Sequence, residues 1–303
     1  MTMNTQAIQL IVPYVQGGGS DQRARLVARY LAGELGESVE VVNRTGAIVG
    51  HTAIAEAAPD GRTIGQVSGE IGMMHWFGGL TPLTPEDYTP LAVPFVEAAA
   101  VIVRQDAPWK TLAEFLETCR GRNIVGSGGP NFGVWKFSLV GLLDKLGIDA
   151  GRLEWAETLS GEQGLAKVIA GEAEVAPITL TDARGPLRSG EARALANMDA
   201  ARHPAFPDVP TVQELLGIPW SVAHWRGLVA PKGLPAKIRE RYVAALRRVA
   251  ANPDFQREAQ ASSFTVDWRF GDEFTRYMAE DDAMFGRIIR LLGPRAGSAS
   301  NLH

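Results

Sequence analysis

Short apolar runs alternate with segments of helical spacing over the first 67 residues of the chain. The apolar runs cover 8–13, 39–42 and 63–67, and the helical segments between them cover 24–35 and 48–58. Short apolar runs bounded by turn residues are typical of buried strands, whereas apolar residues that recur every three or four positions indicate a helix. The alternation therefore predicts a β-α-β-α-β segment whose strands form a parallel sheet with helices on its faces.

The same alternation returns later in the chain. Thr111 with Glu114, and Ser160 with Gln163, match the capping-box pattern that opens helices. Further strands are expected at 98–103, 123–125, 153–156, 174–179, 193–197, 222–229 and 264–267, and late helices at 235–251 and 273–292. We predict an α/β protein of two halves, in which the last elements of the chain are added to the first half.

Composition excludes several classes of protein. The formal charge of −4 and the lack of a basic cluster with aromatics disfavour a nucleic-acid partner. The single cysteine, Cys119, cannot form a disulfide within the chain. No apolar run approaches the roughly 18 residues of a membrane-spanning helix. The first residues, Met1–Gln9, lack a signal-peptide pattern, which fits either a cytoplasmic protein or a mature form recloned with a new start Met.

Each half contains a glycine-rich loop that leads from a strand into a helix. The first is Gly17–Gly19 followed by Ser20, and the second is Gly126–Gly133. The first N–H groups of a helix have no partner within the helix and lie at the positive end of its dipole, so such a loop can bind an anion. The alternative is that both loops are tight connections needed only for folding.

Other motifs are excluded more directly. A phosphate-binding loop needs Gly-Lys-Ser/Thr, and the chain has no Gly-Lys pair. Asn131 stands where a dinucleotide-binding loop has its third glycine, and no Gly-x-Ser-x-Gly motif surrounds Ser20, Ser68 or Ser127. The five histidines have no metal-ligand spacing, so we expect neither a metal nor a cofactor. Cys119 is interpreted as a buried structural thiol.

Aromatic and acidic residues near strand ends are further candidates for a pocket. Each of them is more often a core or surface residue. The aromatic candidates are Trp76, Phe77, Phe132, Trp135 and Trp225, and the acidic ones are Glu70, Glu97 and Glu157.

Five segments, in order along the chain, resemble a known family. They are Ile11–Asp21, Val41–Gly46, Ala57–Thr63, Phe206–Val212 and Trp225–Pro231. The third, Ala-Ala-Pro-Asp-Gly-Arg-Thr, and the fourth, Phe-Pro-Asp-Val-Pro-Thr-Val, are the closest matches. The chain resembles the Bug-type periplasmic solute receptors of tripartite tricarboxylate transporters.

The resemblance implies a two-lobed periplasmic-binding-protein fold, known as a Venus flytrap. Each lobe would have a mainly parallel sheet flanked by helices. Lobe one would comprise 1–103 plus 227–303 and lobe two 104–226, with the ligand in the cleft between them. The family implies a periplasmic receptor, not an enzyme, that binds a small carboxylate (dicarboxylate, aromatic acid or amino acid). Its partners would be this organic acid and membrane transporter subunits, with no membrane insertion of its own.

The ligand residues implied by the resemblance come from the matching positions of both lobes. They are Tyr14, Gln16, Gly18, Gly19, Ser20, Asp21, Ser68 and Gly69 in lobe one; Ser127, Gly129, Asn131, Phe132, Gly133, Ser160, Gly161, Thr179 and Asp182 in lobe two; and Trp225 near the hinge.

The chain departs from the family pattern at positions that bear on the ligand. Gln16 replaces a common alanine, and the second loop has Gly-Pro-Asn-Phe where the family is usually richer in Ser and Thr. The segment Ala156–Gly161 replaces the Tyr-Lys of the family's Val-Pro-Tyr-Lys-Gly with apolar and hydroxyl groups, and Glu70 and Glu157 add acid near the mouth of the cleft. Phe132 and Trp225 favour an aromatic or apolar ligand body, whereas the acids favour a ligand with an amine or several hydroxyls. A ligand sensor for a signalling partner, and an enzyme on the same fold, are the alternatives to a transport receptor.

Overall fold

The chain divides into two compact units. The computed structural model describes residues 7–77, 80–129, 133–262 and 264–292. Unit 1 comprises Met1–Val96 and Trp225–Gly286, and unit 2 comprises Glu97–His224 and Arg287–His303. The division expected from the sequence has the same discontinuous form but assigns 97–103, 225–226 and 287–303 to the other unit.

Unit 1 begins with the alternating elements expected from the sequence. They are β1 (Ile8–Val12), α1 (Gly19–Leu35), β2 (Val39–Asn43), α2 (Ala47–Ala55) and β3 (Thr63–Ser68). Leu10 of β1 lies opposite Val41 of β2 and Ile64 of β3, and both strand pairs are parallel. The predicted parallel β-α-β-α-β segment is therefore confirmed.

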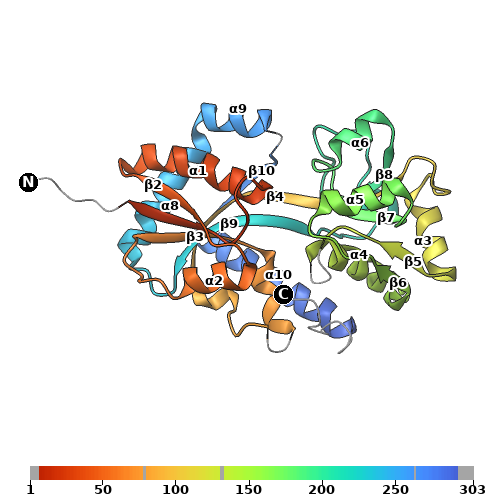
Figure 1. Ribbon diagram of the computed structural model, residues 1–303, viewed down its shortest axis with the longest axis horizontal. Helices are drawn as coiled ribbons and strands as arrows, with labels where there is room; N and C mark the ends of the chain where they lie inside the picture. Colours follow the sequence, from red (N-terminus) through yellow and green to blue (C-terminus); the bar gives the residue numbers. More distant parts are fainter. Residues whose placement is uncertain (1–6, 78–79, 130–132, 263, 293–303) are drawn as a thin grey trace, which may run out of the picture. The chain divides into compact units, whose positions relative to one another are not determined.

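The rest of unit 1 extends this sheet with antiparallel strands. Three 3-10 turns, η1 (Gly69–Gly72), η2 (Met74–Trp76) and η3 (Pro85–Asp87), lead to β4 (Tyr88–Arg104). The late elements are β9 (Ala223–Pro231), α8 (Ala236–Ala251), α9 (Pro253–Ala261), β10 (Val266–Phe270) and α10 (Asp272–Leu292). The strand order is β2-β1-β3-β9-β4, where β9 runs antiparallel to β3 and β10 antiparallel to β4. The chain passes from one unit into the other within β4, near the start of β9 and within α10 (Figure 1).

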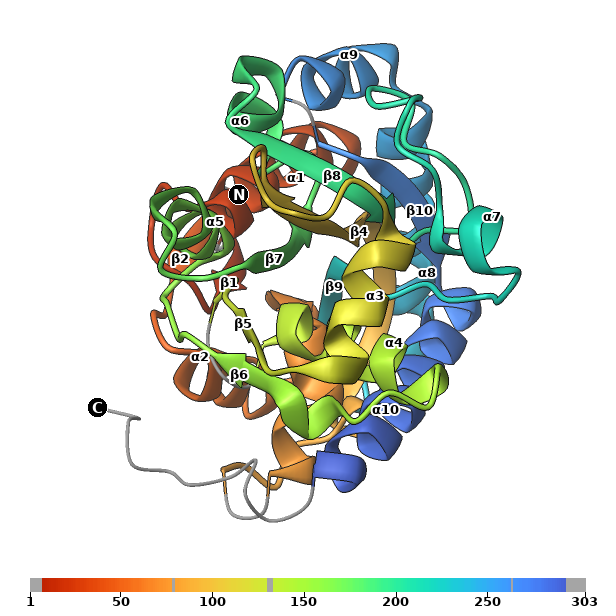
Figure 2. The same ribbon diagram turned by 90° about the vertical axis from the view of Figure 1, so that its right-hand side faces the viewer.

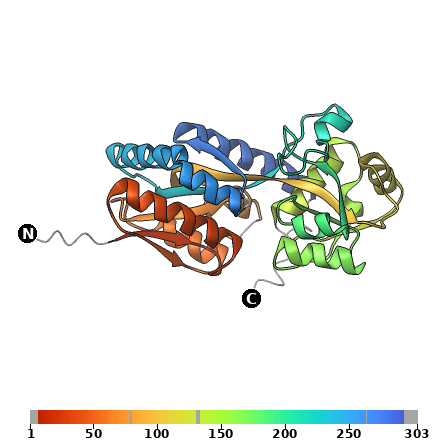
Figure 3. The same cartoon turned by 90° about the horizontal axis from the view of Figure 1, so that it is seen from above.

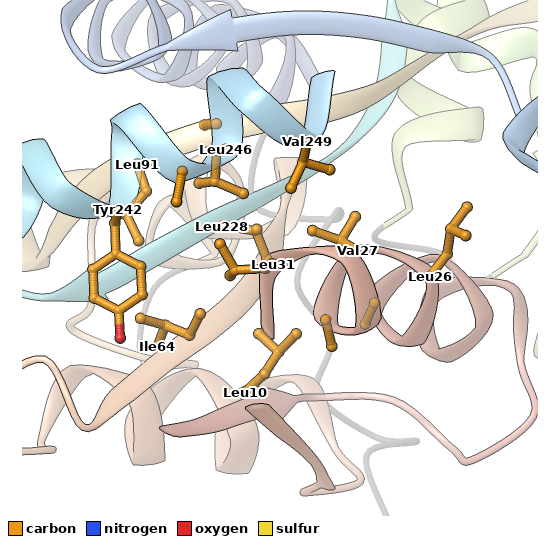
Figure 4. Close-up of a cluster of buried hydrophobic side chains, with 14 of the residues drawn as sticks. Leu10, Leu26, Val27, Leu31, Ile64, Leu91, Leu228, Tyr242, Leu246 and Val249 are labelled. Atoms are coloured by element: carbon orange, nitrogen blue, oxygen red, sulfur yellow. The ribbon is translucent and has the colours of Figure 1, made fainter. Parts of the chain in front are cut away.

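Helices α1, α8 and α9 cover one face of the sheet of unit 1 (Figure 3). Val27 and Leu31 of α1 are one helical turn apart and fully buried, and Leu246 and Val249 of α8 meet them above Ile64 of the sheet (Figure 4). Burying such a side chain stabilises the fold by about 1.5–3 kcal/mol. On the opposite face α2 and α10 contribute Ile54, Phe274 and Met278 to a second apolar cluster.

Unit 2 has its own α/β arrangement. Its elements are α3 (Leu112–Gly121), β5 (Ile124–Gly126), α4 (Val134–Lys145), η4 (Ala150–Arg152), β6 (Leu153–Trp155), α5 (Gly161–Ala170), β7 (Val175–Thr179), α6 (Arg184–Ser189), β8 (Ala192–Asn197) and α7 (Val212–Leu216). β5 is parallel to β6 and to β7, and the second part of β4 is antiparallel to β7 and β8. Helices α4 and α5 lie on opposite faces of the sheet of unit 2 (Figure 2). The α/β fold class is confirmed, with antiparallel pairs contributed by β4, β9 and β10.

Helix starts follow local side-chain chemistry. Thr111 accepts the Glu114 N–H at 3.2 Å and Glu114 accepts the Thr111 N–H at 3.3 Å, so the first predicted capping box is confirmed. Ser160 accepts the Gln163 N–H at 3.3 Å, but the Gln163 side chain accepts the N–H of Leu159 instead of Ser160, at 3.1 Å. Helix α9 has no counterpart in the sequence prediction.

Candidate functional site

The ends of several strands converge at one edge of the sheet in unit 1. Because β1, β2 and β3 are parallel, their carboxyl ends share this edge, which is where ligands bind in open α/β sheets. Tyr14 follows β1, Asn43 ends β2 and Ser68 ends β3. The antiparallel strand β9 reaches the same edge near its start, where Arg226 lies opposite Ser68.

Asp21 holds the first glycine loop in place. Its carboxylate accepts the Gly17 N–H at 2.8 Å, Arg25 Nε at 2.9 Å and Asn43 Nδ2 at 2.9 Å. Asn43 Nδ2 also donates to the carbonyl of Tyr14 at 3.0 Å. Burial by itself raises the pKa of Asp21, but these donors outweigh it and hold the pKa below its ordinary value. Both carboxylate oxygens thus serve the loop, and Gly17 adopts the left-handed φ of +82° that the turn requires.

Tyr14, Ser68 and Glu70 form a hydrogen-bonded chain beside this loop. The Tyr14 hydroxyl donates to Glu70 Oε2 at 3.1 Å and lies 2.8 Å from Ser68 Oγ. A phenol has one proton, so when Tyr14 donates to Glu70 the Ser68 hydroxyl must donate to Tyr14. Ser68 is fully buried, and its oxygen also accepts the N–H of Glu70 at 3.4 Å. The structure thus brings two predicted ligand residues together with Glu70, one of the acidic candidates from the sequence.

The charges of this cluster perturb one another. Burial raises the pKa of Glu70, while the Tyr14 hydrogen bond and the charge of Arg226 oppose the increase. Burial and the neighbouring charge of Glu70 raise the pKa of Tyr14 well above its ordinary value, so its hydroxyl stays protonated. The guanidinium of Arg226 is buried, and its Nε donates to Ser20 Oγ at 3.3 Å at the start of α1.

Trp225 and Gly69 pack together beneath this edge. The Trp225 indole N–H donates to Asp281 Oδ2 at 2.9 Å, and its ring is only 1% exposed. A Cβ on Gly69 would lie 3.2 Å from the same oxygen and 3.4 Å from the indole nitrogen. Burial raises the pKa of Asp281 to about 8. The indole therefore belongs to the core of unit 1, and its assignment as a ligand residue stays a prediction.

The second glycine loop, in unit 2, is built on close backbone contacts. The buried Ser127 hydroxyl donates to the carbonyl of Ala156 at 2.6 Å. Gly129 has a φ of +127°, and its carbonyl accepts Trp155 Nε1 and the Thr158 N–H, each at 3.1 Å. Gly133 forms the N-cap of α4, whereas Asn131 and Phe132 lie outside the described residues. The Ser127 hydroxyl thus has a structural partner of its own.

The start of α5 and the end of β7 lie next to this loop. A Cβ on either Gly128 or Gly161 would lie 3.1 Å from the side chain of Ile178, the residue before Thr179. Thr179 is buried and its hydroxyl accepts the N–H of Asp182 at 2.9 Å. Four predicted groups of unit 2, namely the loop, Ser160-Gly161, Thr179 and Asp182, are therefore neighbours.

The remaining predicted residues of unit 1 lie in the first loop and at the start of α1. The sequence prediction missed two cationic residues. Gln16 and Gly19 are exposed, and Gly18 and Ser20 are half-buried at the start of α1. The sequence prediction did not include Arg226, although it lies in the Trp225–Pro231 segment that resembles the family. It also missed Lys136, which is half-buried in the first turn of α4. Burial lowers the pKa of Lys136, and the charge of Glu157 opposes this decrease.

The described residues give no support to a metal site, a reactive cysteine or a membrane-spanning helix. Within the described ranges, no group of three His, Cys, Asp or Glu residues is placed to hold a metal ion. Cys119 is buried, as expected, and burial raises its pKa to about 12, so the thiol is inert. In the same part of the chain, no helix is both long and apolar enough to cross a membrane.

Comparison with known proteins identifies the family. Residues 23–293 match the tripartite tricarboxylate transporter family receptor, TctC. The chain belongs to the TctC family. The Bug-type resemblance is confirmed too, since protein BugT of Bordetella pertussis is 30% identical over 78% of this chain and 74% of its own.

Solved structures of TctC receptors and related proteins share the fold. A TctC solute-binding protein from Polaromonas, solved without ligand, is 27% identical and superposes with a TM-score of 0.83 over 96% of this chain and 100% of its own. MatC from Rhodopseudomonas palustris, solved with bound malate, is 24% identical and has a TM-score of 0.77 over 94% of this chain and 99% of its own. The Polaromonas relative is a solute-binding protein.

Proposed function

We propose that this protein is a periplasmic solute receptor that binds a small carboxylate-bearing metabolite and delivers it, chemically unchanged, to a tripartite tricarboxylate-type transporter. Membership of the TctC family supports the receptor role. MatC has this fold and was solved with bound malate. At 24% identity, however, the likeness supports only a shared fold. The choice of a carboxylate therefore depends on the residues of this chain.

Arg226 is the observation that carries the carboxylate assignment. It places a buried positive charge at the carboxyl edge of the unit 1 sheet, in contact with Ser20 in the first turn of α1. A guanidinium matches a carboxylate in charge and in its planar pair of donors. The unpaired N–H groups at the start of α1 add further donors of the same polarity.

Unit 2 offers a second set of donors of the same kind. Helices α4 and α5 both begin beside the second glycine loop, and Lys136 lies in the first turn of α4. We propose, from the family resemblance, that the ligand contacts both loops and that closure around it produces the form that the transporter recognises. A ligand that binds one form better shifts the population toward that form.

A thermal-shift screen of the purified protein against dicarboxylates, aromatic acids and amino acids tests the proposal. A ligand that binds only the folded state at 100 times its Kd stabilises it by about 2.7 kcal/mol. We expect at least one acid to raise Tm, and mass spectrometry to recover it unchanged. If no acid raises Tm, the proposed function is wrong; if the recovered acid is altered, the protein is an enzyme.

The Arg226→Gln substitution links binding to the site. It keeps a polar side chain but removes the charge, so we expect the affinity for the bound acid to fall at least tenfold. Arg44→Gln is the matched control, because Arg44 is an exposed arginine of the same unit. Equal affinities of the two variants, both folded by circular dichroism, would contradict the role of Arg226.

A further inference from the structure

Glu70 is a carboxylate at the place where a receptor for anions should have none. It lies in the first turn after β3, half-buried, with burial raising its pKa. A desolvated carboxylate is unfavourable unless cations or hydrogen-bond donors compensate it. A ligand carboxylate next to it would add repulsion between like charges.

The described residues compensate only one side of this carboxylate. In that part of the chain the Tyr14 hydroxyl is its one hydrogen-bond donor, to Oε2 at 3.1 Å. The proton of Tyr14 is thereby used, and the proton of Ser68 is used on Tyr14. The chain Ser68, Tyr14, Glu70 therefore delivers one donor to Oε2 and leaves Oε1 as an acceptor.

The positive charge of Arg226 lies at the same edge of the sheet, on the neighbouring strand β9. Its Nε donates to Ser20 in α1, and Ser68 of β3 is its register partner in the sheet. Arg226 acts on Glu70 through its charge. The edge thus has a cation that contacts Ser20 at the start of α1 and a carboxylate that contacts Tyr14.

We propose that Glu70 Oε1 is an ammonium subsite, so that the ligand of this receptor carries an amine together with its carboxylate. This inference depends on the proposed function, because it names the ligand class for the same site. The carboxylate of an amino acid is held at Arg226 and the loop, and its ammonium donates to Glu70. An ammonium has three donors and a full positive charge, which a hydroxyl lacks, and it compensates the half-buried carboxylate. A dicarboxylate instead brings a second negative charge toward Glu70.

Matched pairs of ligands test the subsite without altering the protein. Titration calorimetry compares alanine with propionate, aspartate with succinate, glutamate with glutarate, and phenylalanine with 3-phenylpropionate. In each pair that binds, we expect the amino acid to bind at least ten times more tightly than the acid without the amine. If the acids without an amine bind as tightly, the subsite is wrong and the receptor function stands. If no member of any pair binds while another acid of the thermal-shift screen does, the subsite is wrong and the receptor function stands; if no acid of the screen binds, the proposed function fails, and the subsite with it.

The Glu70→Gln variant assigns the preference to this residue. It keeps the acceptor for Tyr14 but removes the charge, so we expect the amino acid to lose at least tenfold in affinity and the acid without the amine to change less than threefold. Glu40→Gln, which alters an exposed glutamate on β2, is the control. An amino-acid affinity in Glu70→Gln equal to that of Glu40→Gln would overturn the assignment. Should Glu70→Gln fail to fold, the ligand pairs on the unaltered protein decide the matter.

Discussion

Gly164 of α5 approaches the backbone of Gly128 so closely that a Cβ at residue 164 would lie 2.4 Å from both the amide nitrogen and the Cα of Gly128. The contact joins the helix that follows Ser160 to the second glycine loop. Neither partner can move away like the end of a flexible side chain, because both are backbone. The shape of the loop in unit 2 thus depends on the lack of a side chain at residue 164.

We expect Gly164→Ala to destabilise the protein by about 1–3 kcal/mol, the range of overpacking in a tight interior. Gly33→Ala is the matched control, because a Cβ at that position of α1 meets no atom within 4 Å. Alanine favours the helix there by about 0.5–1 kcal/mol. Urea denaturation measures both changes, and a Gly164→Ala protein as stable as Gly33→Ala would contradict the close contact.

Asp21→Asn should loosen the first glycine loop. The amide would present an N–H₂ group to the donors of Gly17, Arg25 and Asn43, so a buried donor would lose its acceptor, at a cost of about 1–3 kcal/mol at pH 7. The folded pKa of Asp21 is lowered, so its charge stabilises the fold above the unfolded pKa, and that stabilisation is lost as pH falls through the folded value. The deficit of Asp21→Asn should therefore be full at pH 7 and shrink as the pH falls below about 4. Urea titrations at several pH values measure it, and a deficit that grows in acid would contradict this account.

Local patterns predicted the parts of the fold that local physics decides. The alternation of 8–13, 24–35, 39–42, 48–58 and 63–67 predicted the parallel β1-α1-β2-α2-β3 segment because strand and helix periods differ. Helix α9 was missed, although Asn252 caps it and Pro253 follows at its first position, a pattern typical of a helix start. That signal was available from the sequence.

The partners of polar side chains could not be predicted in the same way. Ser127 and Ala156 are 29 residues apart, and Trp225 and Asp281 are 56 residues apart, yet each pair shares a hydrogen bond. Sequence spacing carries no information on such contacts, because packing between distant elements creates them. Tyr14 and Ser68 were predicted individually as ligand residues, but only the parallel pairing of β1 and β3 brings them together.

Ser127→Ala should lower the stability of the protein whether or not Ser127 contacts a ligand. The substitution removes the buried hydroxyl that donates to Ala156, which is worth about 1 kcal/mol. Ser38→Ala changes an exposed serine between α1 and β2 and should be neutral. Differential scanning calorimetry compares the two, and equal Tm values would show that the Ser127 hydrogen bond contributes little. Ligand affinities of Ser127→Ala are therefore meaningful only when corrected for the fraction folded.

Asp281 should make the protein less stable as the pH rises. Burial raises its folded pKa to about 8 from an ordinary value of 3.8, while the charges of Asp282 and Arg269 act in opposite directions. Between these two values the folded state keeps a proton that the unfolded state has released, so the free energy of unfolding falls by about 1.4 kcal/mol for each pH unit.

The Asp281→Asn variant tests this account. Asparagine carries no titratable proton, and its oxygen can still accept the Trp225 indole N–H. We therefore expect the Tm of the unaltered protein to fall more steeply than that of Asp281→Asn between pH 5 and pH 8, and the two slopes to agree below about pH 4. Asp272→Asn, at an exposed position of the same helix, should keep the slope of the unaltered protein. Parallel Tm profiles for Asp281→Asn and Asp272→Asn would mean that Asp281 is ionised in the folded protein.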